Sequence, residues 1–186
     1  MTRLLRGCFL GCSMIVAAPA QAQLGELQVG VIAGYGTGEA YGPGAGLVLG
    51  VAPGRLAYVG LRWTYHAGTT GLRGPVPSEV RTRGQVFAMD LGVQIPVGGL
   101  EVVPSVSVGL NQFTQRAVQP SASGHSREFL VAPGVAVEMY AGRIALIPEI
   151  QYYLAGSPNL PWRVDHRGLV VSARLVFLAE IRRIRR

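Results

Sequence analysis

The chain has 186 residues, and its 17 basic residues exceed its 10 acidic residues, which gives a net charge of +7 at neutral pH. All 17 cations are arginines, of which two lie in the first six residues and four in the last five. The rest of the chain holds 11 arginines against 10 acidic residues and is nearly neutral. Without a basic stripe or a nucleic-acid-binding motif, this charge distribution argues against nucleic acid as a partner.

A secretory signal peptide is predicted at the N-terminus. Arg3 and Arg6 precede an apolar run over residues 7–18, and the Ala-Gln-Ala sequence at 20–22 is a small-x-small site, so we expect cleavage after Ala22. The apolar run is shorter than the roughly 20 residues that a membrane-spanning helix needs. Both cysteines lie in this segment, so the mature chain would have none for a disulfide, thiol catalysis or metal binding.

Apolar residues occupy every second position in most of the chain after residue 23. In the first such segment, Leu27, Val29 and Val31 alternate with Gln28 and Gly30. A period of two is typical of strands whose two faces meet different surroundings. Here the continuous face is apolar and the other carries charges, which indicates a barrel in lipid with a polar interior. Outside the signal segment no apolar stretch approaches roughly 20 residues, so a closed barrel is the remaining way to satisfy the backbone in lipid.

Eight segments with this alternation follow one another. They are predicted at residues 26–35, 44–51, 56–66, 83–95, 102–110, 129–139, 144–152 and 169–177. Long connections at residues 36–43, 67–82, 114–126 and 155–166 alternate with tight turns at residues 52–55, 97–99 and 141–143. This order predicts an all-β fold: an eight-stranded antiparallel up-and-down transmembrane β-barrel, with the N- and C-termini periplasmic and the long loops at the cell surface.

Three prolines lie on the apolar faces of the predicted strands, namely Pro104, Pro133 and Pro148. Proline removes a donor from the hydrogen-bond ladder, and a closed barrel has no free edge to accommodate it. We therefore expect a β-bulge or a local bend at each position, and the pattern does not distinguish the two.

The last alternating segment, residues 169–177, ends on an aromatic residue, Phe177. Together with the other seven segments it resembles the small eight-stranded outer membrane β-barrel family, which includes the barrel of outer membrane protein A and the outer membrane protein X type. The resemblance covers residues 24–177 and implies a protein of the outer membrane of a Gram-negative-type (diderm) bacterium, inserted by the barrel-assembly machinery with periplasmic chaperones. It also implies that Phe177 is an insertion signal, although nine residues follow it. The expected parts are a signal peptide at residues 1–22, a barrel domain at 23–178 and an Arg-rich tail at 179–186.

Charged residues on the polar face are predicted to pair inside the barrel. Arg62 and Asp90 fall at similar depth on neighbouring predicted strands, and Glu149 can approach Arg174 on the next pair. Glu138 is placed in the same interior charge network, and the further polar lining is Gln28, Ser105, Ser107 and Gln151. Because a buried charge without a partner costs several kcal/mol, we interpret the network as a packed polar plug. Many interior positions are glycine or alanine, so a gated or leaky ion path is the alternative.

Aromatic residues gather near the ends of the predicted strands that lead into the long loops. They are Trp63, Tyr65, Phe87, Phe129 and Tyr152. Trp and Tyr are enriched at the level of the lipid headgroups, so these five are predicted to form an aromatic girdle.

The three histidines, His66, His125 and His166, all fall at or in the long loops and could gather on one rim. Some eight-stranded barrels are lipid A modifying enzymes with a histidine, a serine and a carboxylate, and His125 beside Ser126 with Glu128 is the nearest match. An ordinary solvated loop contains the same residues, and no catalytic spacing of that family is matched. We therefore expect no enzyme activity, no cofactor and no metal site.

The sequence favours a non-enzymatic outer membrane barrel that serves envelope integrity or surface interaction through its four loops, in contact with outer membrane lipid. A small ion or solute pore is the first alternative, and a lipid A modifying enzyme is the second. A soluble lipocalin-like barrel would need the apolar face inside, where the bulky residues of eight strands would overfill it. Nothing in the sequence names a surface partner.

Overall fold

The computed structural model describes residues 25–53, 56–74, 77–117 and 121–180. The predicted signal peptide and nearly all of the Arg-rich tail lie outside the described residues. The strands are β1 (Glu26–Gly36), β2 (Gly42–Ala52), β3 (Ala57–His66), β4 (Thr70–Arg73), β5 (Ser78–Val93), β6 (Ile95–Val97), β7 (Leu100–Ala117), β8 (Ala122–Ala141), β9 (Ile144–Ala155) and β10 (Arg167–Glu180). Within the described ranges, no helix is long and apolar enough to cross a membrane.

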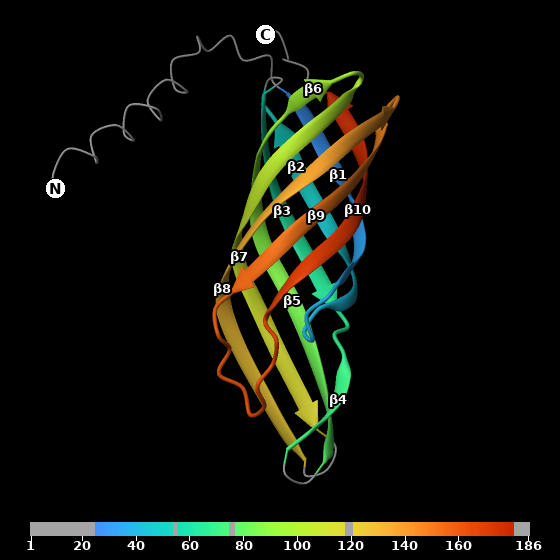
Figure 1. Ribbon diagram of the computed structural model, residues 1–186. Helices are drawn as coiled ribbons and strands as arrows, with labels where there is room; N and C mark the ends of the chain where they lie inside the picture. The colour runs from blue at the N-terminus through green and yellow to red at the C-terminus, as the bar shows by residue number, and fades with distance from the viewer. Residues whose placement is uncertain (1–24, 54–55, 75–76, 118–120, 181–186) are drawn as a thin grey trace, which may run out of the picture.

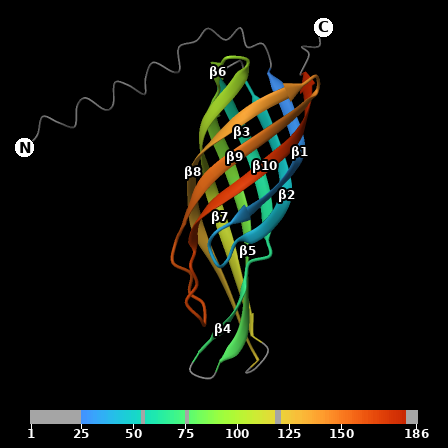
Figure 2. The same cartoon turned by 45° about the vertical axis from the view of Figure 1, so that its right-hand side comes forward.

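Eight of these strands form a closed antiparallel barrel, in the order β1, β2, β3, β5, β7, β8, β9 and β10. The barrel closes where β1 pairs with β10 from Glu26 opposite Glu180 to Gly36 opposite Val170. The short strands are additions: β4 pairs with β5 beyond the end of β3, and β6 pairs with β7. The prediction of an eight-stranded up-and-down barrel is thus confirmed, and Figures 1 and 2 show its strongly tilted strands.

The two-residue period of the sequence is also the period of burial. On β2 and β3, Leu47 and Leu61 are more than half exposed on the outer surface, whereas their neighbours Val48 and Arg62 are almost fully buried inside. The start of β1 and the end of β10 lie opposite each other at the end of the barrel that contains the three tight turns, which we name the turn end. The opposite end, which contains the long connections, is named the loop end.

Each of the three prolines lies where one ladder is interrupted. On β7, Ser105 pairs with Gly92 and Val102 pairs with Ile95, but Pro104 has no partner on that side. Pro133 and Pro148 fall in the two gaps of the β8–β9 ladder, and all three prolines pair with the strand on their other side. The register is the same before and after every gap, so no residue is inserted, and of the two expected features a bulge is excluded. The missing donor is accommodated by a break in pairing.

Two of the predicted loops are wrong, because residues 70–73, 78–82, 114–117 and 122–126 continue as strands. The β7–β8 hairpin extends to the pair Ala117 and Ala122, and β5 continues to Ser78 between β4 and β7. These parts of β4, β5, β7 and β8 form an extension beyond the loop end of the other strands (Figure 1). Polar residues on its outer face replace the apolar ones of the barrel, so the apolar alternation that predicts the strands stops before the strands do.

The interior is less polar than predicted, because two apolar clusters lie in it. One, nearer the turn end, contains Ile32, Val48, Val103, Ala136, Ala145, Ile147, Val176 and Leu178. The other, nearer the loop end, contains Ala40, Tyr41, Val86, Ala88, Phe113, Leu130, Ala132, Tyr153, Ala155, Val164 and Val170. An eight-stranded barrel is narrow enough for side chains to fill it, so apolar side chains can replace water inside.

Candidate functional site: a charge network across the lumen

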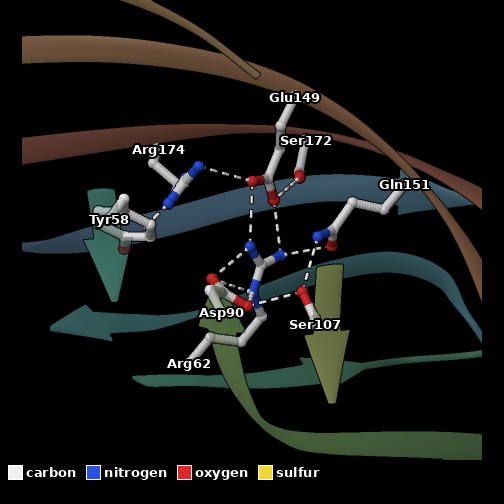
Figure 3. A network of polar contacts seen from close by, with 8 residues as sticks. All are labelled: Tyr58, Arg62, Asp90, Ser107, Glu149, Gln151, Ser172 and Arg174. Atoms are coloured by element: carbon white, nitrogen blue, oxygen red, sulfur yellow. Dashed lines mark hydrogen bonds and ion pairs between the residues drawn. The ribbon is translucent and has the colours of Figure 1, made fainter. Parts of the chain in front are cut away.

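Four charged side chains meet in the barrel interior. Arg62 comes from β3, Asp90 from β5, Glu149 from β9 and Arg174 from β10, and each is at most 4% exposed. They point inward because each occupies a position between two outward apolar residues, such as Leu61 and Trp63 beside Arg62. Figure 3 shows how the side chains from these four strands converge.

Arg62 lies at the centre of the network. Its Nε donates to both carboxylate oxygens of Asp90 at 3.1 and 3.0 Å, and its Nη2 donates to Asp90 Oδ2 at 2.7 Å. Toward the opposite wall, Nη1 and Nη2 donate to the two carboxylate oxygens of Glu149 at 2.6 and 3.0 Å. Nη1 also donates to Gln151 Oε1 at 2.8 Å. Both acid pairs are forked, the strong geometry of arginine and carboxylate.

Arg174 provides the second positive charge. Its Nη2 lies 3.0 Å from Glu149 Oε2, so Glu149 is held between two guanidinium groups. Its Nη1 donates to the Tyr58 hydroxyl at 3.1 Å, and its guanidinium carbon lies 5.4 Å from the centre of the Tyr58 ring. A cation over an aromatic ring is attracted by the ring's negative face, which adds to the stabilisation of this charge.

Neutral side chains complete the network. Ser107 Oγ donates to Asp90 Oδ1 at 2.6 Å and accepts from Gln151 Nε2 at 2.8 Å. Ser172 Oγ donates to Glu149 Oε1 at 2.8 Å. Two positive and two negative charges balance, and every one of them has a charged partner, as a water-excluded network requires.

The network spans the lumen from wall to wall. In the ring of eight strands, β3 and β9 are four positions apart in either direction, so they lie on opposite sides of the barrel. The contact between Arg62 and Glu149 therefore crosses the whole lumen (Figure 3). The two apolar clusters lie on either side of the network along the barrel axis.

Glu138 is not part of this network. It is fully buried near the turn end of the barrel, where Gln94 Nε2 donates to its Oε2 at 3.1 Å and the Tyr140 hydroxyl donates to the same oxygen. The grouping of Glu138 with Arg62 and its partners is wrong, because Glu138 bonds to Gln94 and Tyr140 and lies opposite Glu101, six residues along β7 from Ser107 of the network. Gln94 and Tyr58 are partners that the sequence analysis missed, since neither stands out among neutral interior positions.

The loop end is covered by chain that packs onto it. The Tyr41 hydroxyl donates to the His166 carbonyl oxygen at 2.8 Å and accepts from Asn111 Nδ2 at 2.9 Å. Its burial raises the pKa of the phenol above the ordinary range, so Tyr41 is a neutral donor. Across the opening, the Trp162 backbone exchanges two hydrogen bonds with the Gln115 side chain. The connections 37–41 and 156–166 thus cover this end of the barrel, with Ala40, Tyr41 and Val164 buried beneath them.

The three histidines do not gather on one rim. His66 is buried inside the barrel with its ring 5.5 Å from that of Tyr41, whereas His125 is exposed on the outer face of the β8 extension. Ser126, the next residue, points inward and donates to Glu128. Because neighbouring residues of a strand face opposite sides, His125 and Ser126 cannot act together as a base and a nucleophile. Among the described residues, no three His, Cys, Asp or Glu side chains come together as a metal site.

The five aromatic residues of the predicted girdle all lie on the outer surface. Three of them form one row across neighbouring strands together with Leu110. Trp63 on β3 pairs with Phe87 on β5, Phe87 pairs with Leu110 on β7, and Leu110 pairs with Phe129 on β8. Tyr65 follows Trp63 toward the loop end, and Tyr152 is on β9. Tyr35 on β1, which is 58% exposed, was missed. Phe177 is half exposed near the turn end of β10, where it pairs with Val29 and Ile144.

Comparison with solved structures identifies the fold. The chain is similar to a major outer membrane protein from Thermus thermophilus, with a TM-score of 0.66 and 14% identity over 83% of this chain and 99% of that one. It is also similar to Neisserial surface protein A (TM-score 0.56, 12% identity, 82% of this chain and 95% of that chain) and to the N-terminal barrel domain of Pseudomonas aeruginosa OprF (TM-score 0.53, 11% identity, 86% and 100%). No family model matches the sequence, and no curated protein matches it. The fold is that of the small outer membrane barrels.

Proposed function

We propose that the protein is a non-enzymatic barrel of the outer membrane, closed to ions and solutes, that contributes to envelope integrity and presents its loop-end extension at the cell surface. The barrel has an apolar outer surface, with residues such as Leu47, Leu61 and Val171 more than half exposed. Such an apolar outer surface is stable in contact with membrane lipid. The similar solved structures are outer membrane or surface proteins by their own descriptions, which supports this location.

The single observation that supports a closed barrel best is the contact of Arg62 with Glu149 across the lumen. The two side chains come from opposite walls and are buried, with Nη1 and Oε1 2.6 Å apart. A water-filled channel would separate these groups, because a hydrated path needs room between the walls. The carboxylate and amide oxygens around Arg62 are instead used to bind it, which is the expected arrangement of a structural plug.

Cell fractionation tests the location. The protein is expected in the outer membrane fraction, with a gel band that shifts on boiling because a closed barrel resists the detergent until heated. A soluble periplasmic protein without a heat-shifted band would contradict the proposal. Cells that lack the protein are expected to take up a bulky dye faster than wild-type cells, and unchanged uptake would contradict the contribution to envelope integrity.

Single-cysteine variants test the orientation. Ser123→Cys places a thiol on the exposed face of the extension, and Ala141→Cys places one at an exposed turn of the opposite end. If both termini are periplasmic, a membrane-impermeant maleimide labels Ser123→Cys on intact cells. It labels Ala141→Cys only after the cells have been lysed. The reverse pattern would contradict the orientation. The two native cysteines lie in the signal segment, so after its removal the introduced cysteine is the single thiol in each variant.

A further inference from the structure

The outer face of the extension carries arginines in register. Arg81 on β5 lies directly opposite Arg116 on β7. The next pair of outward-facing residues toward the barrel is Arg83 and Thr114. One row nearer the barrel, Gln85 on β5 pairs with Gln112 on β7, and Gln112 pairs with Arg127 on β8. We name Arg81, Arg83, Arg116 and Arg127 the outer arginine cluster.

This arrangement is unfavourable for the protein alone. Like charges directly opposite each other on neighbouring strands repel, and their Cβ atoms lie only about 5 Å apart. Within the described residues, no ion pair joins any arginine of the cluster to an acid; the acidic residue nearest in sequence on this face is Glu79, two residues from Arg81. The cluster therefore has an excess of positive charge, and an anion would relieve the repulsion.

Three arginines of the cluster line a small hollow in the outer surface. The hollow has a volume of about 170 Å³ and is lined by Arg81, Arg83, Arg116, Gln85, Gln112 and Thr114, with Tyr65 at its side. Guanidinium, amide and hydroxyl groups all donate hydrogen bonds, and guanidinium matches the fork of phosphate oxygens. The hollow thus suits a phosphate group.

An apolar groove crosses β1, β2, β3, β5 and β7, and its part on β5 and β7 adjoins the hollow. It has a volume of about 740 Å³ on the outer surface, and its lining includes Leu47, Leu61, Trp63, Phe87, Met89 and Leu110. The order along the strands is continuous: Phe87 and Leu110 form one outward row, and Gln85 and Gln112 form the next row toward the hollow. A single bound molecule can therefore have its anionic part in the hollow and its apolar part in the groove.

We infer that this face binds a lipid with a phosphate-bearing headgroup, with the phosphate on the outer arginine cluster and an acyl chain along the groove. The inference rests on the proposed function, because it places the groove in the membrane and the hollow at the headgroup level. The positive charge of the hollow is complementary to phosphate, and the apolar lining of the groove is complementary to a hydrocarbon chain. The aromatic row of Trp63, Phe87 and Phe129 lies where the two meet, which is the level expected for aromatic residues at a membrane boundary.

Fluorescence quenching at Trp63 tests the inference. Trp162 is replaced by phenylalanine in all samples, so that Trp63 is the single remaining tryptophan. The mature barrel is reconstituted into phosphatidylcholine vesicles that contain phosphatidic acid, with brominated chains on one lipid or the other. Because each arginine near the headgroups adds attraction for anionic lipid, we expect brominated phosphatidic acid to compete at Trp63 about fivefold better than brominated phosphatidylcholine.

The matched variants decide the outcome. Arg81→Gln with Arg116→Gln is expected to abolish the preference, whereas Arg143→Gln with Arg163→Gln removes the same charge from exposed positions elsewhere and should retain it. Equal preferences in the two double variants would overturn the inference.

A gel of the same vesicles separates this inference from the proposed function. A heat-shifted band shows that the barrel has inserted, so an inserted barrel without lipid preference overturns the lipid site alone. A protein that fails to insert into lipid would contradict the proposed function itself. A preference that follows the outer arginine cluster in an inserted barrel supports both.

Discussion

Two groups of arginines in this barrel have opposite surroundings. Arg62 and Arg174 lie in the lumen, almost fully buried, and together with Asp90 and Glu149 they form a neutral network. Arg81 and Arg116 lie on the outer face of the extension and line the same solvent-facing hollow, without an acidic partner in the described part of the chain. The same side chain thus stabilises the fold in one region and leaves charge available in the other.

The difference follows from solvation. In the lumen, a guanidinium group loses its water and must recover the lost energy from carboxylates and amides, as Arg62 does through its contacts with Asp90, Glu149 and Gln151. On the outer face, water solvates an arginine without a partner, so repulsion costs little and the charge remains for a ligand. Burial therefore distinguishes a structural arginine from a binding one in this protein.

The largest effect is expected from Arg62→Met. The variant leaves Asp90 and Glu149 buried with fewer positive partners, and removal of one member of a buried ion pair costs about 3–5 kcal/mol. The free energy of unfolding, measured by urea titration in phosphatidylcholine vesicles, should fall by that amount. Arg143→Met, at an exposed turn, is the control and should change it little. Equal stability of the two variants would show that the plug does not stabilise the barrel.

A smaller effect is expected from Ser107→Ala. The hydroxyl donates to Asp90 and accepts from Gln151, so its removal leaves a buried amide hydrogen without a partner. Such a loss costs about 1–3 kcal/mol in the free energy of unfolding. Ser105→Ala is the matched control, since Ser105 is less buried and makes none of the hydrogen bonds described for the network. If both alanine variants unfold at the same urea concentration, the neutral members of the network are dispensable.

The smallest effect, and the opposite sign, is expected from Arg116→Gln. Because the variant removes a like-charge pair with Arg81, it should leave the barrel unchanged or more stable by at most about 1 kcal/mol in phosphatidylcholine vesicles. In vesicles with phosphatidic acid, the wild type should gain more stability than the variant does. Urea titrations in the two lipids measure both differences. A variant that is destabilised in phosphatidylcholine would mean that Arg116 is structural, like Arg62.

The sequence predicted the barrel because its signal is repeated in every strand. Alternation of apolar residues indicated the strand faces, and equal depth from a turn brought Arg62 beside Asp90 and Glu149 near Arg174. The pairing of Arg62 with Glu149 across the lumen could not be predicted, because a register relates neighbouring strands and says nothing of opposite walls. The extension could not be predicted from apolar alternation, because Arg81, Arg83 and Arg116 occupy the outward positions that are apolar in the barrel.

The filling of the lumen also required the structure. Tyr41, in the connection between β1 and β2, is fully buried and bonds to Asn111 and to the backbone of His166. A glycine-rich connection such as residues 36–43 predicts a loop, and where a loop folds back depends on contacts distant in the sequence. The sequence therefore indicated polar groups inside the barrel but not the packed layers on either side of them.

Electrical conductance across a planar lipid bilayer tests the closed lumen most directly. The wild-type barrel, with its insertion verified by a heat-shifted band, is expected to produce no current steps, because Arg62 and Glu149 meet across the lumen and apolar side chains fill it on both sides. Stable current steps from the wild type, altered in size or ion preference when Arg62 or Glu149 is neutralised, would contradict the plug and identify the charge network as the lining of a pore.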